Sequence, residues 1–135
     1  MHFHSKTICI TIIVIIIGFQ AAQAQAKLKL KDGDTWDFKA VPEGPDITHD
    51  FEFENTGNAP LIIKYVIAAS GAAIAKWPDQ PILPGKKGII SVVMLTKGHK
   101  GYFYSSFSLT SNASNNKDYA YLYIKGIIAS DTAVK

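Results

Sequence analysis

Residues 47–68 read "ITHDFEFENTGNAPLIIKYVIA", and this stretch decides the fold class. Phe51 and Phe53 alternate with three acidic residues, which predicts a strand with one buried and one solvated face. The letters "NTGNAP" predict a loop, because glycine and asparagine tolerate left-handed backbone and proline cannot continue a hydrogen-bonded ladder. The apolar run "LIIKYVIA" then predicts a second strand. A strand, a loop and another strand indicate a β-sheet protein.

Similar runs lie on both sides of this stretch, and none of them sustains the 3.6-residue period of a helix. The further strands that we expect are 35–41 (TWDFKAV), 88–96 (GIISVVMLT), 102–112 (YFYSSFSLTSN) and 119–128 (YAYLYIKGII). About seven short strands separated by turns are typical of an immunoglobulin-like β-sandwich. We therefore predict one all-β domain over residues 35–130, with an N-terminal lead at 27–34 and a C-terminal tail at 131–135.

The first 26 residues have the layout of a secretory signal peptide. A short basic lead precedes an apolar run of 13 residues, 7–19, and two small-x-small sites end at Ala24 and Ala26. Because a helix needs about 20 apolar residues to span a bilayer, a retained membrane anchor is the weaker alternative. We expect cleavage after Ala24 or Ala26, a secreted or periplasmic protein, and no membrane span once the signal is removed.

Charge and cysteine content argue against nucleic-acid binding and against disulfide bonds. The chain has 14 lysines, no arginine and a formal net charge of +3. Nucleic-acid binding is not expected, since guanine readout and bidentate phosphate contacts depend on arginine and on a larger basic excess. The single cysteine, Cys9, lies in the apolar run, so the mature domain would be held by its core without disulfides.

Small residues mark the bend in residues 65–78, "YVIAASGAAIAKWP". In its centre only Ser70 carries a functional group. Trp77 follows the bend, and we predict that this tryptophan is largely buried, held by Pro78 and packed over the small residues.

Three strings resemble the bacterial secreted family called domain of unknown function (DUF) 1573: "HDFEFENTGNAPLII", "WPDQPILPGKKG" and "YLYIKGIIAS". The resemblance implies an Ig-like fold related to the ASPM-SPD-2-Hydin and PapD-like domains. That family usually has a Cys-Gly-Cys pair at the bend, and the two cysteine positions correspond here to Ser70 and Ala72. A hydroxyl and a methyl group supply neither a soft metal ligand nor an exchangeable sulfur, so no metal or redox role is expected there.

Catalysis and metal binding find little support elsewhere. His49 and His99 have no motif around them, and nothing brings Ser70 and His49 together with an acid as a triad. The carboxylates of "KDGDTWD" lack the later glutamate of a calcium loop. We expect no catalytic residues, no metal and no cofactor.

Tyrosines supply the remaining candidate site. Alternation along the last two strands places five of them on one outer sheet face: Tyr102, Tyr104, Tyr119, Tyr121 and Tyr123. Such a face could bind a partner, or it could hold cross-strand aromatic pairs that only stabilise the sheet. We predict a non-enzymatic interaction or structural module whose partner is a protein or glycan of the cell envelope. A carbohydrate-binding protein that uses the tyrosines is the alternative.

Overall fold

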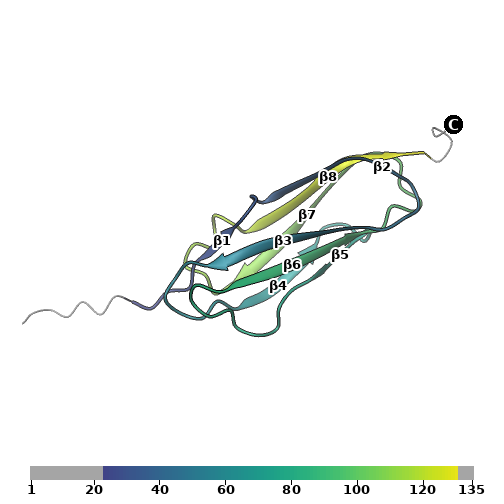
Figure 1. The fold of residues 1–135 in the computed structure, drawn as a ribbon. Helices are drawn as coiled ribbons and strands as arrows, with labels where there is room; N and C mark the ends of the chain where they lie inside the picture. Colours follow the sequence, from purple (N-terminus) through teal and green to yellow (C-terminus); the bar gives the residue numbers. More distant parts are fainter. Residues whose placement is uncertain (1–22, 131–135) are drawn as a thin grey trace, which may run out of the picture.

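The computed structural model describes residues 23–130, which form two sheets packed face to face (Figure 1). The signal peptide expected at residues 1–26 lies mostly outside the described residues, as does the tail at 131–135. Eight strands are present, and no helix occurs in the described part: β1 (Leu28–Leu30), β2 (Thr35–Pro42), β3 (Ile47–Asn55), β4 (Ile63–Ala68), β5 (Ala73–Lys76), β6 (Lys87–Met94), β7 (Gly101–Ser111) and β8 (Tyr121–Ala129). Residues 23–130 contain no helix that is long and apolar enough to cross a membrane.

The strand order is that of an immunoglobulin-like sandwich. One sheet has the order β1-β3-β6-β5 and the other has the order β2-β8-β7-β4. All pairings are antiparallel except that of β2 with β8, which is parallel. The first Ig strand is thus divided: β1 pairs in one sheet and β2 in the other, with Gly33 in left-handed backbone (φ 84°) between them. The predicted fold class is confirmed.

Two strands were not expected from the sequence. Leu28 and Leu30 in β1 are buried, and β1 pairs with the end of β3, so the segment 27–34 belongs to the sandwich instead of leading into it. After the bend, β5 pairs with β6. Both strands are only three or four residues long, and segments of that length show too little alternation to be recognised.

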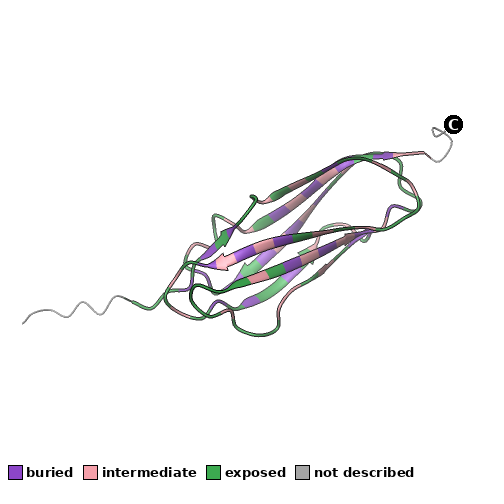
Figure 2. Ribbon diagram, in the orientation of Figure 1, coloured by how far each residue is buried: buried purple, intermediate pink, exposed green. Residues whose placement is uncertain are grey.

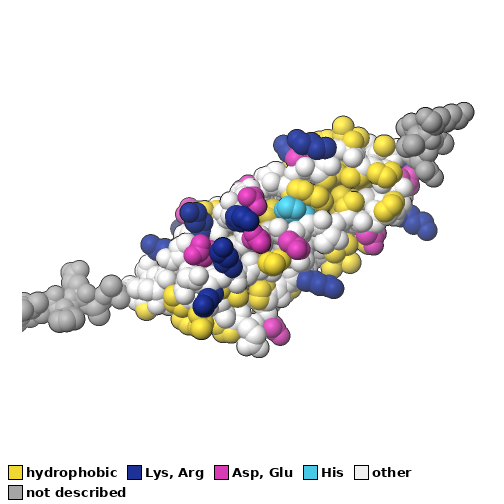
Figure 3. All heavy atoms as spheres, viewed as in Figure 1, with side chains coloured by type: hydrophobic (Ala, Val, Ile, Leu, Met, Phe, Trp, Pro, Cys, Tyr) yellow, Lys and Arg dark blue, Asp and Glu magenta, His cyan; other side chains and the backbone are white. Residues whose placement is uncertain are grey.

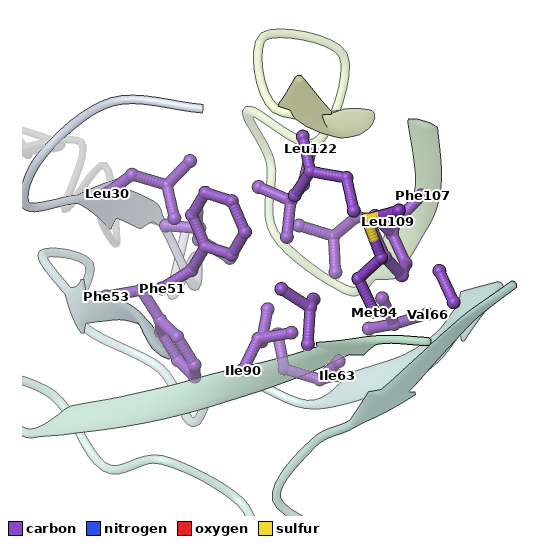
Figure 4. Close-up of a cluster of buried hydrophobic side chains, with 14 of the residues drawn as sticks. Leu30, Phe51, Phe53, Ile63, Val66, Ile90, Met94, Phe107, Leu109 and Leu122 are labelled. Atoms are coloured by element: carbon purple, nitrogen blue, oxygen red, sulfur yellow. The ribbon is translucent and has the colours of Figure 1, made fainter. Parts of the chain in front are cut away.

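The core lies between the two sheets, where the buried residues of each strand alternate with partly or fully exposed ones (Figure 2). Phe51, Phe53, Phe107 and Leu122 are among the buried side chains that meet there (Figure 4). The predicted inward position of Phe51 and Phe53 is therefore correct.

Candidate interaction surface

One outer face of the sandwich is rich in tyrosine. On the sheet β2-β8-β7-β4, the register places Tyr104 beside Lys125, Tyr102 beside Ile127, and Tyr121 beside Ser108. Because side chains alternate along a strand, these residues and their neighbours share the side that points away from the core. We call this surface the aromatic face, and its members are Tyr65, Ile67, Tyr102, Tyr104, Tyr121, Tyr123 and Ile127.

These side chains are strongly exposed. Tyr102 is 72% exposed, Tyr104 54% and Tyr121 51%, whereas Tyr123 lies partly buried between two of them. The Tyr123 ring stacks on Tyr104 at a centroid distance of 5.9 Å and on Tyr121 at 6.3 Å. The stack thus joins three neighbouring rings on the surface of the sheet.

Tyr65 joins this face because of an irregularity in β4. The pairing of β4 with β7 shifts register between Ile63 and Tyr65. Lys64 and Tyr65 are both exposed, while Ile63 and Val66 are buried. Strict alternation from Ile63 would have turned Tyr65 inward, and the bulge places it outside at 59% exposure.

Tyr119 was predicted on the face, but the structure places it elsewhere. It precedes β8, in the turn after β7, and its side chain packs against the hydrophobic core. The strand predicted from the sequence began at Tyr119, but β8 begins only at Tyr121, so the predicted alternation does not apply to Tyr119. Five of the six tyrosines still share the face, with Tyr65 in place of Tyr119.

Small hydroxyl side chains and a few lysines surround the rings. Ser106, Ser108 and Thr110 point outward from β7. The charged residues on or beside this face are Lys64, Lys125, Asp37 and Lys39. Three of these four residues are lysines.

A groove lies at the edge of the aromatic face, where β2 is interrupted. The register of β2 shifts between Asp37 and Ala40, and Lys39 there has a positive φ of 63°. The Lys39 amide donates a 2.9 Å hydrogen bond to Asp37 Oδ1, which lowers the pKa of the Asp37 carboxyl. The groove has a volume of about 420 Å³ and is lined by these residues together with Tyr102, Lys125, Gly126 and Ile127.

The opposite face of the sandwich is charged. On the outer side of β1-β3-β6-β5, lysines and carboxylates are interspersed: Lys29, Lys31, Asp50, Glu52, Glu54, Lys76 and Lys87 (Figure 3). Lys31 Nζ lies 2.9 Å from Glu52 Oε2, and Ser91 donates a 2.6 Å hydrogen bond to Asp50. We call this surface the charged face.

Trp77 lies at the edge of the charged face. Most of its side chain is covered, as predicted, but it is not fully enclosed. Its ring packs only partly against the core and also lines a groove of about 530 Å³ with Lys76, Pro78 and Ile89. The residue comes directly after β5, beyond the last paired position of the sheet, so no strand covers its outer side.

The small residues of the bend have structural roles. Ala72 and Ala73 are each 7% exposed, and the Ala72 amide donates a 3.2 Å hydrogen bond to Ser70 Oγ. The Ser70 hydroxyl therefore closes the turn.

Two histidines, His49 and His99, lie within residues 23–130. His49 lies at the opening between the sheets, stacked on Trp36 at 4.6 Å and edge-on to Phe51 at 4.7 Å. Partial burial lowers the pKa of the His49 imidazole. Within residues 23–130 no three His, Cys, Asp or Glu side chains lie close enough together to hold a metal ion.

This arrangement defines an immunoglobulin-like β-sandwich, and its fold is similar to that of PapD-like domains. A human CEP192 PapD-like domain superposes with a TM-score of 0.58 at 12% identity, covering 78% of this chain and 87% of that one. A protein of unknown function from Porphyromonas gingivalis W83 gives a TM-score of 0.66 at 18% identity, over 78% of this chain and 48% of that one. At such low identity the likeness shows the fold alone, and the chain spans about half the length of the P. gingivalis protein.

A family model described as "Protein of unknown function (DUF1573)" matches residues 28–128, and the chain belongs to this family. No curated protein matches the sequence. The VesB protease of Vibrio cholerae is also similar in fold, with a TM-score of 0.53 at 12% identity, but the match covers only 32% of that chain.

Proposed function

We propose that this protein is an exported, non-enzymatic interaction module that binds a partner protein through the aromatic face. The observation that carries the proposal is the concentration of exposed rings on one sheet: Tyr65, Tyr102, Tyr104 and Tyr121 are each more than half exposed. Exposed side chains of this size cost solvation free energy while they remain uncovered, and a monomer rarely gathers them without a partner.

The composition of the face favours a protein partner. Tyrosine and isoleucine supply rigid contact area, while Ser106, Ser108 and Thr110 supply adaptable hydrogen bonds between the rings. This mixture is common in protein–protein contacts, where aromatic residues are enriched and charged residues are depleted at the centre. The lysines at the margin, Lys64, Lys39 and Lys125, complement a partner surface that carries acidic residues.

The location of the protein follows from its first residues. A basic lead, a 13-residue apolar run and small-x-small sites support export to the periplasm or the medium. The partner is therefore a protein of the cell envelope.

Binding to the envelope fraction of the source organism, before and after protease digestion of that fraction, tests the proposal. The probe is the mature domain, and a triple variant, Tyr104→Ala, Tyr121→Ala and Tyr123→Ala, removes the ring stack. A matched triple variant on the charged face, Glu52→Ala, Lys76→Ala and Lys87→Ala, serves as the control. We expect the tyrosine variant to bind the captured, purified partner about 100-fold more weakly or worse, and the control to stay within about threefold.

Three results would overturn the proposal. They are retention of binding by a folded tyrosine triple variant, equal loss in the charged-face control, and binding that survives protease digestion. A glycan array with the same proteins would then identify the aromatic face as a carbohydrate site if the wild type binds and the tyrosine variant does not.

A further inference from the structure

The two expected cleavage points, after Ala24 and after Ala26, differ in their structural setting, although both end a small-x-small pattern. Gln25 pairs with Asn58 in both directions: the Gln25 amide donates to Asn58 Oδ1 at 2.6 Å, and the Asn58 amide donates to the Gln25 carbonyl at 2.9 Å. The Ala26 carbonyl accepts a 2.8 Å hydrogen bond from the Ser114 amide. Residues 25 and 26 are thus bonded to the loops that follow β3 and β7.

Ala26 is small for a reason that does not involve processing. Its side chain is 3% exposed and belongs to the hydrophobic core, immediately before the buried Leu28. The chain at Gln25 passes so close to the loop after β3 that a Cβ atom at Gly57, in that loop, would overlap the Gln25 carbonyl. Packing alone therefore explains the alanine at the second site, whereas Ala24 is exposed.

We propose that the mature protein begins at Gln25, because the signal peptide is removed between Ala24 and Gln25 and not between Ala26 and Lys27. This inference rests on the export proposed above. Cleavage after Ala26 would remove two acceptors and one donor, leaving the Ser114 and Asn58 amides without their partners. Cleavage after Ala24 keeps every one of these bonds.

The chemistry of the new terminus favours the same site. Hydrolysis of the Ala24–Gln25 bond consumes one water and leaves a carboxylate on Ala24 and an ammonium group on Gln25. That ammonium group still reaches Asn58 Oδ1, and a hydrogen bond from a charged donor is stronger than one from a neutral amide. Once the domain folds, the Ala26–Lys27 bond is protected, since Ala26 is buried and the Lys27 carbonyl accepts a 3.0 Å bond from Thr56. The exposed Ala24 leaves the preceding bond open to a peptidase whether cleavage comes before or after folding.

N-terminal sequencing of the exported full-length product is the direct test. We expect a single terminus at Gln25. A terminus at Lys27 would overturn this inference and leave export intact, whereas a product that retains Met1 would also remove the proposal of a cleaved, exported domain. Ala22→Phe alters only the first small-x-small site, so it is expected to stop processing at Gln25 and to leave precursor.

A stability comparison tests the physical reason independently. Two domains, one starting at Gln25 and the other at Lys27, are released from a cleavable fusion so that no residue is added. We expect the shorter domain to melt about 5–10 °C lower, as the loss of three hydrogen bonds implies. Asn58→Ala is the matched variant: it should lower the midpoint of the longer domain by several degrees more than that of the shorter one. Equal midpoints for the two starts, or equal effects of Asn58→Ala on both, would contradict the structural role of Gln25.

Discussion

The two sheets of the sandwich are alike inside and different outside. Both contribute alternate apolar residues to one core, and both use a glycine to admit an aromatic ring: Gly88 faces Phe53, and Gly126 faces Phe38. Outside, β1-β3-β6-β5 carries interspersed lysines and carboxylates together with two exposed isoleucines, Ile74 and Ile89, whereas β2-β8-β7-β4 carries the exposed tyrosines.

This difference is the basis for proposing the aromatic face as the binding surface. Interspersed charges such as Lys31 and Glu52 keep a sheet face soluble and need no partner. Exposed rings add no comparable solubility, and the ring stack of Tyr104, Tyr121 and Tyr123 occurs on one face only in the described part of the chain. The inner similarity reflects folding, and the outer difference points to function.

The largest change in stability is expected from substitutions of the two glycines that face aromatic rings in the core. Gly88→Ala places a methyl group against the Phe53 ring, which is 1% exposed and paired with position 88 in the middle of its sheet. We expect a loss of about 2–3 kcal/mol of unfolding free energy, measured in urea. Gly126→Ala should cost about 1 kcal/mol, because Phe38 lies on the edge strand β2, beside the bulge, and can move aside. A cost for Gly126→Ala as large as that for Gly88→Ala would show that the edge strand is as rigid as the centre of the other sheet.

A smaller effect, of opposite sign, is expected inside the tyrosine-bearing sheet. Ser105 is 3% exposed, and its Oγ has no hydrogen-bond partner among the described residues. Ser105→Ala should raise the unfolding free energy by about 1 kcal/mol, since a buried hydroxyl without a partner opposes folding.

Ser111→Ala is the matched control for this prediction. Ser111 Oγ is 2.8 Å from Asn116 Oδ1 and accepts a bond from the Ala113 amide, so its removal should cost about 1 kcal/mol. Destabilisation of equal size by both substitutions would indicate that Ser105 has a hydrogen-bond partner in solution.

The smallest effect is expected on the charged face. The Lys31–Glu52 hydrogen bond lowers the pKa of Glu52 and raises that of Lys31, but both side chains are largely exposed. Glu52→Gln should therefore move the thermal midpoint by less than about 2 °C at low salt, and high salt should abolish the difference.

The pH dependence of this pair has a definite sign. Because the folded pKa of Glu52 is lowered, its contribution is present above the ordinary pKa of glutamate and is lost as pH falls through the folded value. Because the folded pKa of Lys31 is raised, the same contribution disappears as pH rises through that value. If Glu52→Gln instead moved the thermal midpoint by several degrees and the shift persisted in high salt, the charged face would be more than a solvated surface.

The candidate site was predicted only in part. Tyr102, Tyr104, Tyr121 and Tyr123 follow from alternation in two long strands that pair as a hairpin. Tyr119 was misplaced because the strand begins two residues later, and Tyr65 was missed because the register shift in β4 reverses the alternation. A bulge depends on the partner strand, so its position does not appear in the local pattern.

Sequence reasoning alone was enough to predict the all-β class, the inward positions of Phe51 and Phe53, and the resemblance to a family whose model matches residues 28–128. These properties are local, since the two-residue period of a strand is written into neighbouring letters. The folded chain was needed to show which tyrosines share a face and that residues 25–30 are part of the domain. Both depend on pairing between distant segments: Tyr65 lies beside Thr110, and the Leu28 amide donates to Asn115 Oδ1 at 3.0 Å. Such contacts are fixed by the packing of the whole sandwich, because no local pattern specifies a partner so far along the chain.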